Sequence, residues 1–144
     1  MPSVLRNVLA VVAGIVIGGA VNGALIALSP MLIPPPAGVD LGSTESLAKA
    51  MPLFEPRHFI MPFLAHALGT LAGAWTAYLI AGSHKARMAY VIGVVFLCGG
   101  IAASLMIPAP AGFMAIDLLF AYIPMAWLSV RMGMRMQRDN ARAA

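Results

Sequence analysis

Three strongly polar side chains interrupt otherwise apolar stretches of this chain: Asn22, His66 and Asp117. An aspartate within a membrane-spanning stretch costs about 2.5–3.5 kcal/mol on insertion scales unless it is paired or hydrated. A neighbouring histidine can pair with it, and an Asp–His pair in a dry environment can exchange a proton near neutral pH. This chemistry requires that the elements carrying the three residues bring them together.

The composition indicates what those elements are. Of the 144 residues, 61% are hydrophobic and only 10% are charged, and the mean hydropathy is +0.90. A soluble domain carries about 25% charged residues, and a chain of this length cannot hide so much apolar surface in one soluble core. We therefore expect an all-α integral membrane protein, a four-helix transmembrane bundle.

Four stretches are long enough to cross the hydrocarbon layer as helices, which takes about 20 apolar residues. They cover approximately residues 5–28, 59–81, 88–107 and 112–130 of a single membrane domain, 1–144. The first is expected to be a retained anchor, since its apolar part exceeds the roughly 7–15 residues of a signal peptide. The outer loop, 29–58, contains a predicted short helix at about 44–51, which either lies on the membrane surface or forms a lid.

The basic residues predict the orientation, because loops rich in lysine and arginine stay in the cytoplasm. Only Lys49 and Arg57 fall on one side of four alternating helices. The other side has Arg6, Lys85, Arg87, Arg131, Arg135, Arg138 and Arg142. Both termini are therefore expected in the cytoplasm. The aromatic belt predicted at that interface consists of Trp75, Tyr78, Tyr90 and Trp127.

Small residues recur every four positions in the first two predicted helices. Helices in lipid associate through close backbone packing, which small residues permit. These helix-packing ridges consist of Gly14, Gly18 and Asn22 in the first helix and Gly69, Gly73 and Ala77 in the second. They predict either packing within one chain or contact with a second copy or a larger complex.

The three polar residues lie at similar predicted depths, roughly six to eight residues from the outer helix ends, or about 9–12 Å. We therefore predict a buried polar cluster, composed of Asn22, His66, Thr70, Ser104 and Asp117. It could be a structural network that fixes helix register, a proton or ion site, or a ligand or lipid-headgroup site. Pro124 should kink the fourth helix beside this cluster, because it leaves the carbonyl of Phe120 without a donor.

The C-terminal segment places arginines at a spacing of three or four residues, at positions 131, 135, 138 and 142. A basic helix beside a membrane span is expected to bind anionic lipid headgroups. The protein has a net charge of +4, and we expect its basic residues to bind lipid and not nucleic acid. No metal-ligand, nucleotide-binding or hydrolase motif is present. The sequence thus predicts no cofactor, no metal site and no catalytic residue.

The stretch "MPLFEPRHFIMPFLAHALGTLAGAWTAYLIAGSHK", with "LLFAYIPMAW" later, resembles a family of small four-span bacterial proteins without an assigned function. The resemblance covers most of the chain and implies a multi-pass protein of the bacterial inner (plasma) membrane, but no activity.

Three function hypotheses follow from the sequence. The first is a non-enzymatic membrane protein that self-associates as a homo-oligomer or docks onto a larger complex. The second is a small proton- or ion-coupled transporter or channel that uses Asp117 and His66. The third is a lipid- or ligand-binding membrane protein or an intramembrane enzyme.

Overall fold

The computed structural model describes residues 2–143, which contain no strand, and 83% of the protein is helical. The helices in chain order are α1 (Ser3–Leu32), α2 (Thr44–Ala50), the 3-10 helices η1 (Met51–Leu53) and η2 (Pro56–Phe59), α3 (Ile60–Ile80), α4 (Lys85–Met106), α5 (Ala111–Phe120) and α6 (Ile123–Ala143). Four segments of the described chain are long and apolar enough to span a membrane: α1, η2 with α3, α4, and α5 with α6. The predicted all-helical class with four such segments is confirmed.

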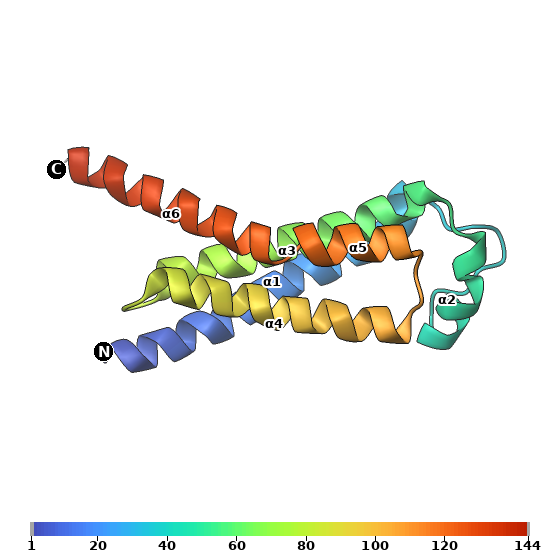
Figure 1. Ribbon diagram of the computed structural model, residues 1–144, viewed down its shortest axis with the longest axis horizontal. Helices are drawn as coiled ribbons and strands as arrows, with labels where there is room; N and C mark the ends of the chain where they lie inside the picture. Colours follow the sequence, from blue (N-terminus) through green and yellow to red (C-terminus); the bar gives the residue numbers. More distant parts are fainter. Residues whose placement is uncertain (1, 144) are drawn as a thin grey trace.

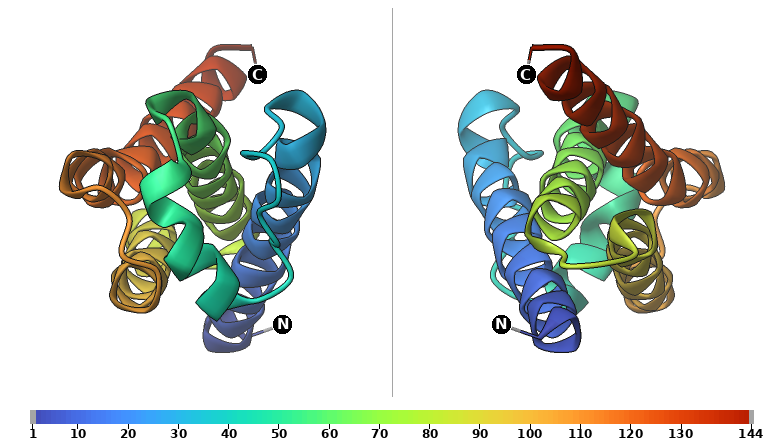
Figure 2. Two further views of the ribbon diagram at one scale, coloured as in Figure 1. Left: turned by 90° about the vertical axis from the view of Figure 1, so that its right-hand side faces the viewer. Right: turned by 90° about the vertical axis from the view of Figure 1, so that its left-hand side faces the viewer.

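The long helices run side by side, with α3 in contact with α1, α4 and α6 (Figure 1). Both ends of the described chain and the turn between α3 and α4 lie at one end of the bundle, called the terminal end below. The segment between α1 and α3 lies at the opposite end, called the loop end. Viewed along the bundle, α2 lies across the loop end (Figure 2).

The two small-residue ridges pack against each other within one chain. A Cβ atom on Gly14 would lie 2.7 Å from the carbonyl oxygen of Gly73, and one on Gly18 would lie 2.7 Å from that of Gly69. Ala77, the last member of the second ridge, is fully buried. Because the backbones of α1 and α3 touch here, any larger side chain at these glycines would separate the helices.

The start of α1 is hydrogen-bonded to the turn that follows α3. The guanidinium group of Arg6 donates to the carbonyl of Ile80, with its Nη2 at 3.0 Å. The side-chain oxygen of Asn7 accepts from the backbone N–H groups of Gly82 and Ser83, at 3.0 and 3.2 Å. The last carbonyls of a helix have no partner within it, so Arg6 satisfies one of those of α3.

The fourth predicted span is two helices, α5 and α6, separated by Ala121 and Tyr122. Pro124 has no N–H to donate to the carbonyl of Phe120, and this missing bond lies at the break. The chain is therefore broken where the sequence predicts a kink, and it does not continue as one helix over 112–130. After the break, α6 runs without interruption to Ala143.

Tyr78 is 3% exposed. Its ring lies against Gly133, and its hydroxyl donates to the side-chain oxygen of Gln137 at 3.2 Å. Tyr78 therefore does not point outward, as the residues of an aromatic belt do, because Gly133 leaves room for its ring inside the bundle. Trp127, by contrast, is exposed and carries the guanidinium of Arg131 over its ring, 4.8 Å from the centroid.

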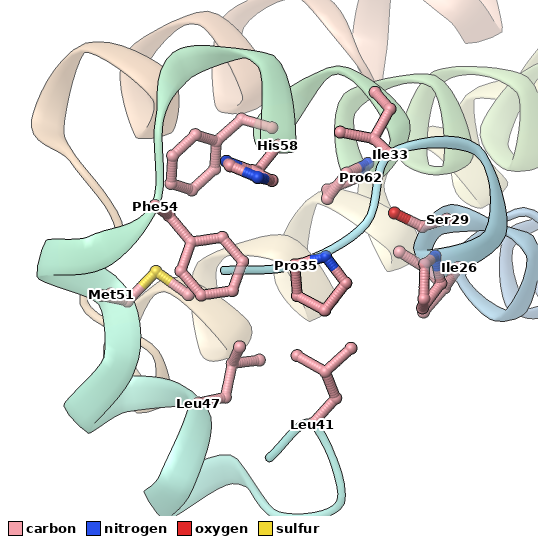
Figure 3. Close-up of a pocket in the computed structure, with 12 residues that line it drawn as sticks. Ile26, Ser29, Ile33, Pro35, Leu41, Leu47, Met51, Phe54, His58 and Pro62 are labelled. Carbon is pink, nitrogen blue, oxygen red and sulfur yellow. The ribbon is translucent and has the colours of Figure 1, made fainter. Parts of the chain in front are cut away.

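The loop end is ordered by a buried histidine, His58. Its Nδ1 accepts from the backbone N–H of Glu55 at 2.9 Å, and its Nε2 lies 3.1 Å from the carbonyl oxygen of Pro34. This second contact joins the segment after α1 to the segment before α3. An apolar pocket of about 190 Å³ lies beside it, and Leu47 and Met51 contribute to its wall (Figure 3).

Candidate functional site

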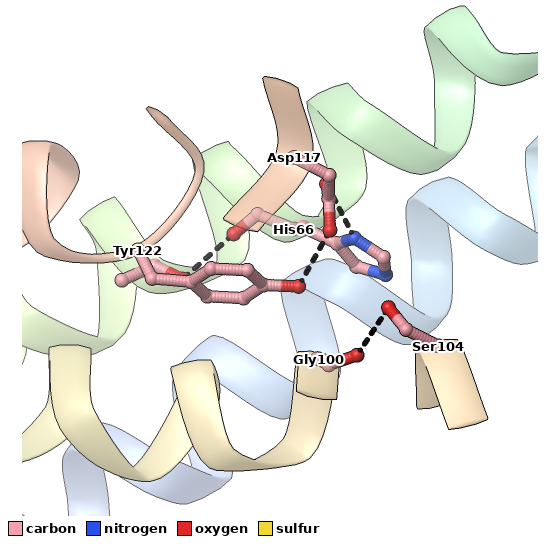
Figure 4. A network of polar contacts seen from close by, with 6 residues as sticks. His66, Gly100, Ser104, Asp117 and Tyr122 are labelled. Carbon is pink, nitrogen blue, oxygen red and sulfur yellow. Dashed lines mark hydrogen bonds and ion pairs between the residues drawn. The ribbon is translucent and has the colours of Figure 1, made fainter. Parts of the chain in front are cut away.

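Two side chains, those of His66 and Tyr122, meet around the buried carboxylate of Asp117 (Figure 4). His66 Nδ1 lies 2.8 Å from Asp117 Oδ1, and the Tyr122 hydroxyl donates to Asp117 Oδ2 at 2.9 Å. Asp117 is 3% exposed, and both of its oxygens are engaged. These residues, called the carboxylate cluster below, come from α3, from α5 and from the break before α6.

The helix break and a glycine on α4 position Tyr122. Tyr122 lies five residues after Asp117, and on an unbroken helix the two side chains would point to different faces. The break turns Tyr122 back toward the carboxylate. Its ring and hydroxyl lie directly against Gly100, where even a methyl group would collide with them. The Tyr122 ring also stacks on His66, with ring centroids 5.9 Å apart.

The predicted cluster members separate into two groups. The structure brings His66 and Asp117 together and places Asn22 beside the same cavity as His66. Thr70 and Ser104 bond instead to carbonyls one turn earlier in their own helices, those of His66 and Gly100, at 2.8 and 2.9 Å. Their hydroxyls therefore satisfy the helix backbone and not the side chains of the cluster.

Asn22 contacts the second ridge directly. A Cβ atom on Gly69 would lie 2.9 Å from the Cβ of Asn22. Its side-chain oxygen is buried and has no hydrogen-bond partner among residues 2–143. A buried acceptor without a partner costs about 1–3 kcal/mol, so Asn22 is a polar group that still requires a donor.

Tyr122 is a member of the carboxylate cluster that was not predicted from the sequence. The available signal was the tetrapeptide "AYIP", in which Pro124 follows a tyrosine by two residues. A break at this point, instead of a kink, is what brings the hydroxyl within reach of Asp117.

A cavity of about 390 Å³, called the lateral cleft, lies between α1 and α4. His66 and Tyr122 line it from the side of the carboxylate cluster, and Asn22 lines it from α1. Its walls contain Gly19 on α1 and Gly99 on α4, both exposed, and an added Cβ atom would meet nothing within 4 Å at either glycine. The cleft therefore opens at the side of the bundle, where lipid would surround these helices.

A second cavity of about 240 Å³, called the vestibule, lies between the carboxylate cluster and the loop end. It shares His66, Gly100 and Ala103 with the lateral cleft and also contacts Asp117. Its remaining lining is largely apolar and includes Leu47 of α2 and Met51 of η1. His66 thus lies where the two cavities meet, and α2 covers the vestibule.

The arrangement leaves one nitrogen of His66 for an incoming group. Asp117 holds Nδ1, while Nε2 points away from the carboxylate (Figure 4). A carboxylate fixes the orientation of an imidazole in this way. The cluster can therefore give a hydrogen bond, accept one, or take up a proton. No group of three or more His, Cys, Asp or Glu side chains suited to a metal ion occurs among the described residues.

Toward the terminal end, the bundle is closed by packed small and apolar side chains. The core cluster there consists of Ala74, Ala77, Tyr78, Ala89, Ile92, Ala126 and Val130. Ser129, also fully buried, donates to the carbonyls of Leu71 and Met125, both at 3.0 Å. The cavities next to His66 open to the side and toward the loop, and the packed core separates them from the terminal end.

Comparisons of the chain with protein-family models, with curated proteins and with solved structures gave no match. The candidate site is defined by the geometry of the carboxylate cluster and its two cavities.

Proposed function

We propose that this chain is a multi-pass protein of the bacterial inner membrane that binds an amphipathic molecule in the lateral cleft, with the polar end of the ligand at His66. One observation carries the proposal: His66, held through Nδ1 by the buried Asp117, lines a cavity that is open at the side of the bundle, and its Nε2 points away from the carboxylate. Ligand sites of this kind are concave and mostly apolar, with a few polar groups that fix orientation.

The charge distribution supports an orientation with both termini in the cytoplasm. The terminal end carries Arg6, Lys85, Arg87 and the arginines of α6, while the loop end carries Lys49 and Arg57. Because positive residues favour the cytoplasmic side, the loop end faces outward. The lateral cleft then opens into the outer leaflet.

Two observations favour binding over the other hypotheses. The ridges of α1 and α3 are occupied by each other, which removes them as a docking surface for a second copy. Toward the terminal end the core is packed with small and apolar side chains, and the buried hydroxyls of Thr70 and Ser129 bond to backbone carbonyls. Neither hydroxyl extends the carboxylate cluster as a proton or ion pathway requires. A ligand site needs access from only one side, and the lateral cleft provides it.

Self-association or docking onto a larger complex is the second candidate function, now through a different face of α1. Gly19 and Gly23 form a GxxxG pair, and added Cβ atoms would meet nothing within 4 Å at either position. A helix from a partner could approach closely there. This face borders the lateral cleft, so a bound helix and a bound amphiphile would compete.

The basic helix α6 is proposed to contact anionic headgroups. Its residues Arg131, Arg135 and Arg138 line a hollow of about 180 Å³ together with Met134. Arginine binds phosphate oxygens through two parallel hydrogen bonds, and lysines or arginines near a membrane surface each contribute about 1 kcal/mol to its attraction for anionic lipid.

The binding proposal is tested by native mass spectrometry of the protein extracted with its own lipids in polymer-bounded discs. Wild type is compared with Gly99→Leu, which should project a side chain into the lateral cleft from a position where an added Cβ atom meets nothing within 4 Å, and with Gly112→Leu, an open position outside both cavities. We expect a reproducible bound molecule in wild type and Gly112→Leu that is lost in Gly99→Leu.

The possible results are distinct. A bare monomer in all three samples would overturn the proposal. A defined oligomer that Gly99→Leu leaves intact and that Gly23→Leu dissociates would replace it with the self-association hypothesis.

A further inference from the structure

We infer that the ligand of the lateral cleft is a neutral amphiphile whose polar end is a hydroxyl group, an inference that rests on the proposed function. The hydrogen-bonding capacity of His66 and Asn22 and the charges around them carry it. A long-chain alcohol and a phenol with an apolar tail share this chemistry.

The position of the proton in the Asp117–His66 pair decides whether Nε2 of His66 donates or accepts a hydrogen bond. If Asp117 is ionised and His66 is neutral, the shared proton lies on Nδ1, and Nε2 accepts a hydrogen bond. If His66 is charged, or if the proton lies on Asp117, Nε2 carries a hydrogen and donates. A hydroxyl group both donates and accepts, so it pairs with Nε2 in every one of these states. An ammonium group only donates, and an ester or carboxylate only accepts.

Asn22 is a second polar side chain on the cleft wall that could bind the ligand, since the Tyr122 hydroxyl already donates to Asp117. Its side-chain oxygen is buried without a partner among the described residues, and its amide offers one acceptor and two donors. A hydroxyl bound to His66 still has a lone pair or a hydrogen for this amide. The same ligand group would thus serve residues from both α1 and α3.

The charged side chains around the two cavities favour a neutral ligand. The two cavities are lined by Asp117 and His66 and by no lysine or arginine. The Asp–His pair carries a net charge of zero or minus one, so a phosphate or carboxylate would find no net positive charge to compensate its desolvation. An ammonium group would find the carboxylate already bonded to His66 and Tyr122. A neutral polar group avoids both costs.

The apolar wall of the lateral cleft can hold the apolar part of the ligand. The lateral cleft of about 390 Å³ has room for roughly a dozen water-sized groups at ~30 Å³ each. Its wall is formed by Val95, Phe96 and Ala103 along with glycines. Since the cleft opens at the side of the bundle, a chain longer than the cavity can extend into the surrounding lipid.

The test uses four photoreactive probes of identical chain length that end in an alcohol, a methyl ester, a carboxylic acid or an amine. The full-length protein in phosphatidylcholine liposomes is irradiated with each probe, and the labelled residues are identified by mass spectrometry. Wild type, Gly99→Leu, Asn22→Leu and the control Gly112→Leu are compared. Gly19→Leu is a second way to fill the lateral cleft if Gly99→Leu does not fold.

We expect the alcohol to label residues of the lateral cleft roughly fivefold more than the ester, equivalent to about 1 kcal/mol. Gly99→Leu should abolish that labelling, and Gly112→Leu should keep it. Asn22→Leu should lower the alcohol-to-ester ratio, because it removes one of the two polar side chains proposed to bind the hydroxyl, while His66 remains. Cleft labelling by the acid, ester or amine that equals or exceeds the alcohol, and that Gly99→Leu still blocks, would overturn the hydroxyl inference alone. Labelling that is the same in Gly99→Leu as in wild type for all four probes would overturn the proposed function as well.

Discussion

The hydroxyl group of Tyr122 lies directly against Gly100, so the hydrogen bond from Tyr122 to Asp117 exists only because residue 100 has no side chain. The contact links α4 to the helix break in the fourth span. The geometry of the carboxylate cluster therefore depends on Gly100, a residue without a functional group.

Gly100→Ala should therefore displace Tyr122 from Asp117. Forcing a methyl group into a filled core costs about 1–3 kcal/mol, and unfolding by sodium dodecyl sulfate in mixed micelles would measure the loss. Gly100→Ala and Tyr122→Phe disturb the same hydrogen bond, so the double variant should be less destabilised than the sum of the single variants. Strict additivity would show that Gly100 does not act through Tyr122.

Two adjacent glycines of α1 should respond oppositely to alanine. Gly18 faces the Gly69 carbonyl and the Phe96 ring, so Gly18→Ala should lower the free energy of unfolding by about 1–3 kcal/mol. Gly19 faces open space, so Gly19→Ala should leave stability unchanged or raise it by up to about 1 kcal/mol. The same unfolding measurement applies. Equal losses of unfolding free energy at the two positions would contradict a structure in which Gly18 packs against α3 and Gly19 faces open space.

Two substitutions of Asp117 should distinguish the contribution of its charge to stability from the contribution of its hydrogen bonds. In Asp117→Asn the amide can still accept from Tyr122 and can donate to Nδ1 of His66, so a cost below about 1.5 kcal/mol is expected. Asp117→Ala leaves both partners unsatisfied and should cost about 2–3 kcal/mol. If Asn and Ala destabilise equally in thermal unfolding, the ionised pair itself, and not its hydrogen bonds, stabilises the fold.

His58→Ala should loosen the loop end without affecting the bundle. The substitution removes the contacts of the ring with Pro34 and Glu55. Hydrogen exchange of residues 37–50 should accelerate roughly tenfold, as expected for a local loss of about 1.4 kcal/mol, while α4 and α6 stay protected. Lys49→Ala is the matched control, because the exposed Lys49–Glu45 pair contributes little. Unchanged exchange in His58→Ala would mean that the loop is held elsewhere.

Proteoliposomes loaded with a pH-sensitive dye test whether the carboxylate cluster conducts protons. The packed core at the terminal end predicts that wild type dissipates an imposed pH gradient no faster than Asp117→Asn or empty liposomes. A faster rate in wild type that Asp117→Asn abolishes would favour the transporter hypothesis instead.

The pairing of His66 with Asp117 was predictable from sequence because both residues are costly in lipid and occur at similar depths. Asn22 could likewise be placed beside them, since it continues the ridge of Gly14 and Gly18. These predictions require only the periodicity of a helix and the thickness of the membrane. They do not depend on the detailed geometry with which α1 packs against α3.

The positions of Thr70, Ser104 and Tyr122 depend on finer detail. A threonine or serine hydroxyl can bond the carbonyl one turn earlier or reach across to another helix, and the sequence is the same in both cases. Tyr122 joins the carboxylate cluster because the helix breaks and does not merely kink, and Pro124 is compatible with either outcome. Tyr78 was assigned to the membrane interface from its position near the end of its helix. The burial of its ring could not be predicted, because the space for it is left by Gly133, which follows much later in the chain.

The bonds of Arg6 and Asn7 to residues 80–83 have a consequence for biogenesis. Both partners of the first helix, the ridge on α3 and the turn after it, are synthesised only after most of the first half of the chain has left the ribosome. A helix as apolar as α1 can enter a bilayer by itself, and in a membrane it would then lack these partners until α3 and the turn after it have been made. During that interval Gly14 and Gly18 would face lipid, and the new chain would depend on the later helices to give α1 its final neighbours.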